Sequence, residues 1–220
     1  MSSTPVPEPL PRTAEEAAED AYWHGLYGDW APLDLPALRD LLAGFDRPWW
    51  VVGGWAIEAF TGVPREHEDL DLSVLACDVP ALRAHLCDWH LWSISDQALR
   101  PLTDRHPDPP APDGQLWLRR DARSPWVADL PLTPDHEGRW TNKRLPAHVA
   151  PVEEVTFVRD GVRHLRPEIV LLFKARLHRA KDERDLAVTW PLLDDVRRAW
   201  LLDALARVHP DHPWLERLSG

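Results

Sequence analysis

Residues 48–74 constrain the fold most tightly, because their hydrophobic period changes twice within a short stretch. The apolar run PWWVV ends at Gly53 and Gly54, which predicts a short strand stopped by a turn. GWAIEAFTG then has apolar residues at helical spacing and a closing glycine, which predicts a short helix. LDLSVLA alternates polar and apolar residues and predicts a half-buried strand. The segment therefore predicts a strand, a helix and a second strand that carries acids on one face.

Two of these acids, Asp69 and Asp71, lie two positions apart on the second predicted strand. Their side chains should emerge on one face with Cα atoms about 6.5 to 7 Å apart. Two carboxylates about 4 Å apart without a counterion would repel by on the order of 4 kcal/mol. A hard divalent cation such as Mg²⁺ removes this repulsion, since it takes oxygen ligands. The pair is thus a candidate metal site, and a solvated polar strand face is the alternative.

The glycines and the basic residues between them and the acids are candidates for holding a phosphate. Gly53 and Gly54 lie where a strand ends and a helix begins, so unobstructed backbone N–H groups and the positive helix end can face an anion. A tight turn is the structural alternative. Arg65 and His67 can add charge or orientation, or pair with neighbouring acids such as Glu58.

Two more charged residues lie in apolar segments further along the chain. Asp129 in WVADLPL is an acid within an otherwise apolar predicted strand, where a third metal-binding carboxylate and proton acceptor fits. It can instead be a structural acid in a salt bridge. Lys174 in LLFKARLHRAKD lies on a largely apolar helix face and can reach a phosphate, or can extend its ammonium to water.

The whole chain reads as an α+β fold with a mixed sheet and a helical C-terminal region. Residues 1–12 are expected to be a flexible arm, residues 13–165 an α+β core and residues 166–220 a helical region. The core should contain a hairpin turning at Asp160 and Gly161. The helical period of the last third breaks near Trp190 and Pro191. The thirteen tryptophans are expected mostly in the core, with one or two lining a ligand pocket.

Composition narrows the class of partner. With 25 basic and 36 acidic residues the formal net charge is −11, which argues against duplex nucleic acid and favours a small cationic substrate. The two cysteines have no metal-binding spacing. The sequence shows neither a signal peptide nor a run of 18 apolar residues, so no membrane partner is expected and a cytoplasmic location is predicted.

The segment GGWAIEAFTGVPREHEDLDLSV resembles the nucleotidyltransferase superfamily with the DNA polymerase beta fold. Within it, the segment is similar to the aminoglycoside and lincosamide nucleotidyltransferase-like branch, whose motif is GGWA, a short helix, Gly, and Arg-x-His-x-Asp-hydrophobic-Asp. WVADLPL, RHLRPEIVLLFKARLHRAKDERDL and HPWLERL also look like the later half of that branch. Trp55 replaces the Ser or Thr of the wider superfamily, in agreement with the branch, and Glu58 stands where the branch is expected to have Asp.

This resemblance implies a polymerase beta-like core and an enzyme that moves a nucleoside monophosphate from ATP or another NTP to a hydroxyl of a small acceptor, with Mg²⁺ as cofactor, two ions being expected. An aminoglycoside-type antibiotic is the acceptor we expect, and resistance to it the biological effect. Gly53 and Gly54 would then hold the triphosphate, Asp69 and Asp71 the metal, and Asp129 would be the third ligand and base. The alternatives are a protein or RNA acceptor, as in toxin and antitoxin systems, and a non-catalytic nucleotide-binding protein.

Overall fold

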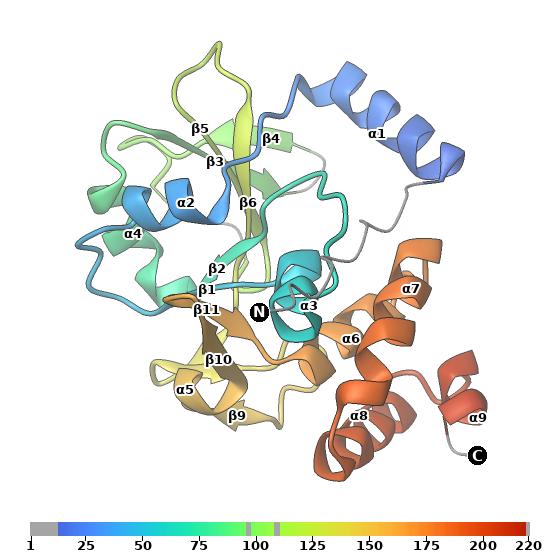
Figure 1. Ribbon diagram of the computed structural model, residues 1–220. Coiled ribbons are helices and arrows are strands. Elements are labelled where there is room, and N and C mark those ends of the chain that lie inside the picture. The colour runs from blue at the N-terminus through green and yellow to red at the C-terminus, as the bar shows by residue number, and fades with distance from the viewer. Residues whose placement is uncertain (1–12, 96–97, 108–110, 219–220) are drawn as a thin grey trace, which may run out of the picture.

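The computed structural model describes residues 13–95, 98–107 and 111–218. It has the predicted α+β architecture, with sheets in one half of the molecule and a group of C-terminal helices beside them (Figure 1). The expected arm, residues 1–12, lies outside the described residues. Within the described part of the chain, no helix is long and apolar enough to cross a membrane.

A four-stranded mixed sheet contains both strands of the segment 48–74. Its strand order is β10-β11-β1-β2, and its strands are β1 (Trp49–Val51), β2 (Leu72–Val74), β10 (Thr156–Arg159) and β11 (Val162–Leu165). Strand β1 runs parallel to β11 and antiparallel to β2, so the predicted mixed sheet is confirmed. β10 and β11 form the predicted hairpin, which turns at Asp160 and Gly161.

A second four-stranded sheet is antiparallel throughout and has the order β4-β3-β5-β6. Its strands are β3 (His90–Ser95), β4 (Ala98–Pro101), β5 (Gln115–Arg119) and β6 (Trp126–Pro131). Parallel bridges from Asp71 to Asp129 and from Leu75 to Thr133 join β2 to β6, so the two sheets meet along these strands. A small third sheet contains β7 (Asp135–His136), β8 (Arg139–Thr141) and β9 (Val149–Ala150).

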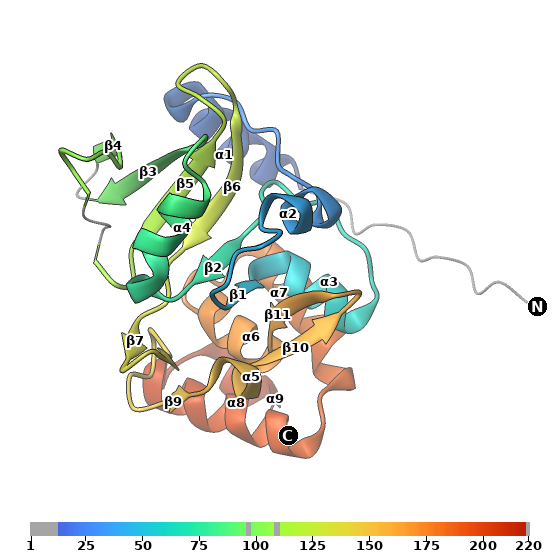
Figure 2. The ribbon, with the colours of Figure 1, turned by 90° about the vertical axis from the view of Figure 1, so that its left-hand side faces the viewer.

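Helices cover the sheets and build the C-terminal region (Figure 2). The α-helices are α1 (Ala14–Tyr27), α2 (Leu35–Leu41), α3 (Gly53–Thr61), α4 (Val79–His85), α5 (Val152–Val155), α6 (Pro167–Ala175), α7 (Ala180–Thr189), α8 (Asp195–Val208) and α9 (Pro213–Leu218). Two short 3-10 helices are η1 (Ala76–Asp78) and η2 (Trp190–Leu192). η2 lies at the predicted break near Trp190 and Pro191 and contains Pro at its start.

Two hydrophobic clusters stabilise the fold on either side of the mixed sheet. One packs α3, α6 and α8 together and includes Ile57, Leu171 and Leu201. The other packs α2 and α4 against β2 and β6 and includes Leu72 and Leu130. Because β2 takes part in one cluster and α3 in the other, the loop between them is held from both sides. This loop carries Asp69.

Candidate active site

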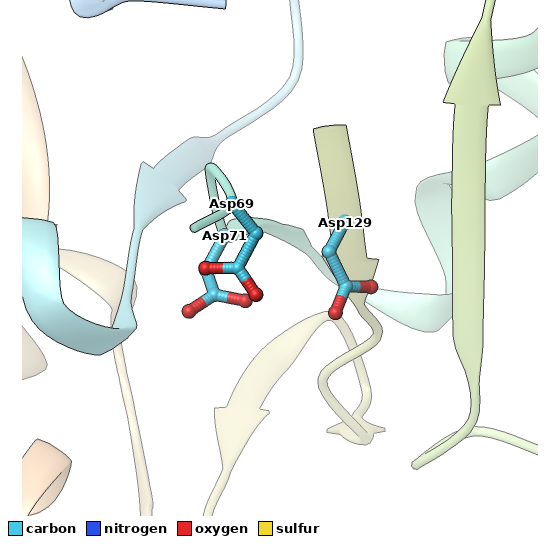
Figure 3. A group of neighbouring side chains, drawn as sticks. All are labelled: Asp69, Asp71 and Asp129. Carbon is cyan, nitrogen blue, oxygen red and sulfur yellow. The ribbon is translucent and has the colours of Figure 1, made fainter. Parts of the chain in front are cut away.

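Asp69, Asp71 and Asp129 come together where β2 meets β6 (Figure 3). Asp71 and Asp129 are bridge partners, and the Asp129 N–H donates to the Leu70 carbonyl at 2.9 Å. One ligand oxygen from each of the three acids lies within 4.8 Å of the others. The strand predicted to begin at Asp69 begins only at Leu72, with Asp71 in a bridge just before it. The two predicted neighbours and the third acid nevertheless form one cluster.

The three carboxyl groups sit in an environment that opposes their charge. Burial, and next Asp69, raises the pKa of Asp71 to about 7. Burial also raises the pKa of Asp69, and it raises that of Asp129 well above the usual value, with Asp71 and Asp69 adding to the effect. Carboxylates in this state favour either protons or a cation between them.

The donor set fits a hard divalent cation. All the converging ligands are carboxylate oxygens, which Mg²⁺ prefers. The Oδ1 atom of Asp129 is buried and has no hydrogen-bond partner among the described residues, so a lone pair is available inside the cluster. Its other oxygen, Oδ2, accepts a hydrogen bond from Gln115 Nε2. A cation bound between the three carboxylates would satisfy this buried oxygen.

Charged side chains lie so close to both glycines that a Cβ at either position would displace them. Helix α3 begins at Gly53, which has a φ of +63°, and a Cβ on it would lie 1.9 Å from Asp71 Oδ2. A Cβ on Gly54 would lie 1.7 Å from the Arg65 guanidinium. The Asp71 carboxyl group is thus next to the N-terminus of α3, where the first backbone N–H groups have no intrahelical acceptor. The predicted proximity of the diglycine turn and the acids is confirmed.

Arg65 and His67 lie in the loop between α3 and the acids, and Glu58 of α3 holds that loop. The Glu58 Oε2 atom accepts from the Arg65 N–H at 3.0 Å and lies 2.8 Å from His67 Nε2. His67 stacks on Trp55 with ring centroids 3.8 Å apart, and burial lowers the pKa of His67 to about 4. A neutral His67 donates its Nε2–H to Glu58. These contacts favour a positioning role for His67.

Trp55 completes this support. Its indole Nε1–H donates to the Asp69 carbonyl at 3.0 Å, so helix α3 fixes the backbone of the first acid. Trp55, which stands where the wider superfamily has Ser or Thr, thus contacts the loop that carries Asp69. The Arg65 guanidinium lies against Gly54 and 4.0 Å from Asp185 Oδ1, so it faces the start of α3.

Lys174 is buried on α6 and lies between two acids of α7. Its Nζ atom is 3.1 Å from Asp182 Oδ1 and 2.8 Å from Asp185 Oδ2. The alternative, that Lys174 extends its ammonium to water, is wrong, because the side chain is buried and pairs with two carboxylates. Contact between Lys174 and a phosphate stays a prediction.

Lys143 and Gln115 interact with the acids, and the sequence did not indicate either residue. Lys143 follows β8 in a loop, and the Asp71 and Asp129 charges both act on its ammonium group. Burial lowers the pKa of Lys143, Arg144 lowers it further, and the two acids raise it. No sequence pattern around Lys143 distinguishes it from other lysines, and Gln115 looks like any polar residue at the start of a strand. Only chain folding brings them to the acids.

Comparisons with known proteins agree with this geometry. Residues 34–98 match the aminoglycoside-2''-adenylyltransferase family, and the match includes both glycines and the first two acids. The solution structure of the antibiotic-resistance factor ANT(2'')-Ia is 15% identical and has a TM-score of 0.52, with 90% of this chain and 97% of that chain covered. The chain has a nucleotidyltransferase fold. The crystal structure of ANT(2'')-Ia in complex with adenylyl-2''-tobramycin is 17% identical, with a TM-score of 0.50 and 78% and 97% coverage.

The predicted resemblance to aminoglycoside nucleotidyltransferases is therefore confirmed over residues 34–98, and the fold of the chain agrees with it. The match ends before Asp129, so the third acid of this nucleotidyltransferase fold is located by the structure. No curated protein sequence matches the chain significantly.

Proposed function

We propose that this protein is a Mg²⁺-dependent nucleotidyltransferase that moves a nucleoside monophosphate from ATP or another NTP to a hydroxyl of an aminoglycoside-type acceptor. The observation that carries the proposal is the convergence of Asp69, Asp71 and Asp129 at the N-terminus of α3. The acceptor class comes from the family match and from the adenylylated tobramycin in the ANT(2'')-Ia complex. Antibiotic resistance and a cytoplasmic location are parts of the same proposal.

Each group of the site has a role in this reaction. The backbone N–H groups at Gly53 and Gly54 hold the triphosphate, and Arg65 adds positive charge behind them. Asp129 accepts the proton of the acceptor hydroxyl. The hydroxyl oxygen forms a bond to the α-phosphorus, the bond from that phosphorus to the β-phosphate oxygen breaks, and pyrophosphate leaves with the electron pair. Asp69, Asp71 and Asp129 would hold two Mg²⁺ ions, which when bound neutralise the acids and the phosphate charge.

Substituting Lys143 tests the cation that the structure adds to the site. The charges of Asp71 and Asp129 raise the pKa of Lys143. Its Nζ atom lies 5.5 Å from the Phe173 ring centroid. We propose that it contacts a phosphate oxygen of the bound nucleotide. Lys143→Met should then lower kcat/KM for the nucleotide by roughly 100-fold, the loss of one charge-assisted contact in a buried site. Steady-state kinetics at varied nucleotide concentration measures this.

Lys143→Arg is the matched control and should retain more activity than the methionine variant, since it keeps the charge. Equal kcat/KM in the Lys143→Met variant and the native enzyme would show that Lys143 has no contact with the nucleotide.

The central experiment is a screen for pyrophosphate release with Mg²⁺, each NTP, and panels of aminoglycosides and lincosamides. The native protein should release pyrophosphate only with an acceptor present, and mass spectrometry should find the acceptor heavier by one nucleoside monophosphate. EDTA should abolish the reaction. The Asp69→Ala variant run beside it shows whether any release depends on the acidic cluster.

The same screen separates the alternatives. A protein or RNA acceptor would appear as labelled polymer when labelled ATP is added to cell extract, without release on the small-molecule panels. A non-catalytic protein would show no transfer and, in calorimetry, would bind ATP without regard to Mg²⁺. Either result would refute the proposed reaction.

A further inference from the structure

A cavity of about 420 Å³ opens directly beside the acidic cluster. Its lining comes from α1, the antiparallel sheet, the loop before β2 and the start of α7. Asp69 and Asp129 are part of this lining, whereas Gly53, Asp71 and Lys143 are not. The cavity therefore reaches the cluster from the side of the proposed base, away from the turn proposed to hold the triphosphate. Its volume is typical of a small-molecule site.

One side of the cavity is an aromatic wall made of Tyr27, Trp30 and Trp117. The Trp117 ring lies 5.1 Å from Trp30 and 5.4 Å from Tyr27, both in edge-on geometry. Trp117 is the direct cross-strand partner of Asp129, so the two side chains share one face of the sheet. The wall thus begins next to the atom proposed to take the proton of the acceptor.

The aromatic wall is supported from behind. The Trp126 ring lies 5.2 Å from Trp117, and its indole N–H donates to the Tyr27 carbonyl at 2.8 Å. Trp126 is buried, with 1% of its surface exposed. Backbone bonds from Ala31 to Trp126 and from Leu33 to Val127 add the segment after α1 to the edge of β6. The rings are therefore held in place before a ligand binds, which reduces the entropy cost of binding.

The charged groups of the cavity are already partnered. Lys181 lies 2.9 Å from Glu68, and Arg179 lies 3.1 Å from Asp182. Among the described residues that line the cavity, Glu68 is the only carboxylate outside the acidic cluster. A polycation bound by ionic contacts would need several free carboxylates, and this wall does not supply them.

We propose that the aromatic wall is the acceptor subsite, and that it stacks against the apolar C–H face of a hydroxylated six-membered ring whose hydroxyl meets Asp129. Stacking on Trp30 and Trp117, more than ion pairing, supplies the acceptor affinity. The acceptor is thus an amino sugar compound whose reacting ring carries few ammonium groups. This inference rests on the proposed function, since it needs a reacting hydroxyl at the acidic cluster.

Kinetics of wall variants test the subsite. Trp30→Leu and Trp117→Leu should each raise the KM for the acceptor roughly tenfold, the value of one aromatic contact, while the KM for the nucleotide stays within about twofold. Trp30→Phe and Trp117→Phe should restore most of the lost affinity. Trp190→Leu is the matched control, because Trp190 is half-buried on η2 and lies outside the cavity lining. It should leave both constants unchanged.

Salt dependence is the second readout and does not require a variant. A stacked acceptor should change its KM less than about threefold between roughly 0.05 and 0.5 M NaCl, because stacking is not screened. A steep rise of the acceptor KM with salt would overturn the inference.

The outcomes separate this inference from the proposed function. If no acceptor in the panels accepts a nucleotidyl group, the proposed function itself fails. If transfer occurs and the leucine variants retain the native acceptor KM, only the aromatic subsite is refuted. A rise in the nucleotide KM alone would assign the wall to the nucleobase and overturn the acceptor subsite. Trp30 and Trp117 are both half-buried, so thermal melting of each leucine variant shows whether that variant has kept the fold.

Discussion

Replacing Asp71 by asparagine should lower nucleotidyl transfer by roughly 1,000-fold or more, because the variant loses a ligand of the metal that neutralises the phosphates. The same change removes one of three mutually repelling acids from a partly buried cluster. The metal-free variant should therefore melt at a higher temperature than the metal-free native protein at pH 8. Turnover and thermal melting, each measured with and without Mg²⁺, check the two effects.

The pH dependence of melting has a definite sign. The pKa of Asp71 is about 7 in the folded protein against an ordinary value of 3.8. Between these values the folded state holds more protons than the unfolded state, so metal-free stability should fall as pH rises from about 4 to about 7. Mg²⁺ binds the deprotonated cluster, so its stabilising effect should be largest above pH 7 and should be reduced in Asp71→Asn.

Asp203→Asn is the control for these measurements. Asp203 is an exposed acid on α8 that pairs with Arg207, so its loss should change neither turnover nor the response to Mg²⁺. Native turnover in Asp71→Asn would refute the assignment of the metal site. An unchanged Mg²⁺ response in melting would do so without reference to activity.

Asp129→Asn should lower kcat by roughly 100-fold to 10,000-fold or more, because the variant loses both the proposed base and a proposed metal ligand. The nucleotide KM should change much less, because Asp129 faces the acceptor side of the cluster. Asparagine keeps the shape of the side chain but cannot take a proton. Single-turnover kinetics with a saturating nucleotide measures the chemical step directly.

The pH profile of a second variant distinguishes a base from a purely structural acid. Gln115 donates to Asp129 and thereby lowers the pKa of that carboxyl group, opposing the effect of burial. Gln115→Leu should raise this pKa, and the acid side of the kcat profile should move to higher pH, since Asp129 accepts a proton only when ionised. An acid limb at the same pH in both proteins would contradict the role of Asp129 as base.

Local patterns in the sequence were sufficient to predict the helices and strands around the site. The apolar run before Gly53, the helix closed by Gly62 and the alternation after Asp69 each depend on residues within a few positions of one another. Backbone sterics and burial of one face act over that same range, so period and glycine placement predict such elements well. The hairpin at Asp160 and Gly161 was predictable for the same reason.

The partners of single charged residues could not be predicted, because several groups can reach each of these side chains. From the sequence, His67 can contact a phosphate or pair with an acid, and in the structure it pairs with Glu58. From the sequence, the Lys174 ammonium can reach a phosphate or extend to water, and in the structure it lies between Asp182 and Asp185. A side chain long enough to reach several neighbours has no defined partner until packing removes the alternatives.

Hydrophobic period, turn residues and spacing are local properties of the chain, so they were enough to predict the α+β class, the elements around the site and the three acids. Folding of the whole chain is needed to place Asp129 opposite Asp71, to bring Lys143 and Gln115 to these acids, and to line the adjoining cavity with Trp30 and Trp117. These arrangements depend on how β2 pairs with β6 and on which helices cover the sheets. That pairing is set by burial of the whole core, which no short window of sequence contains.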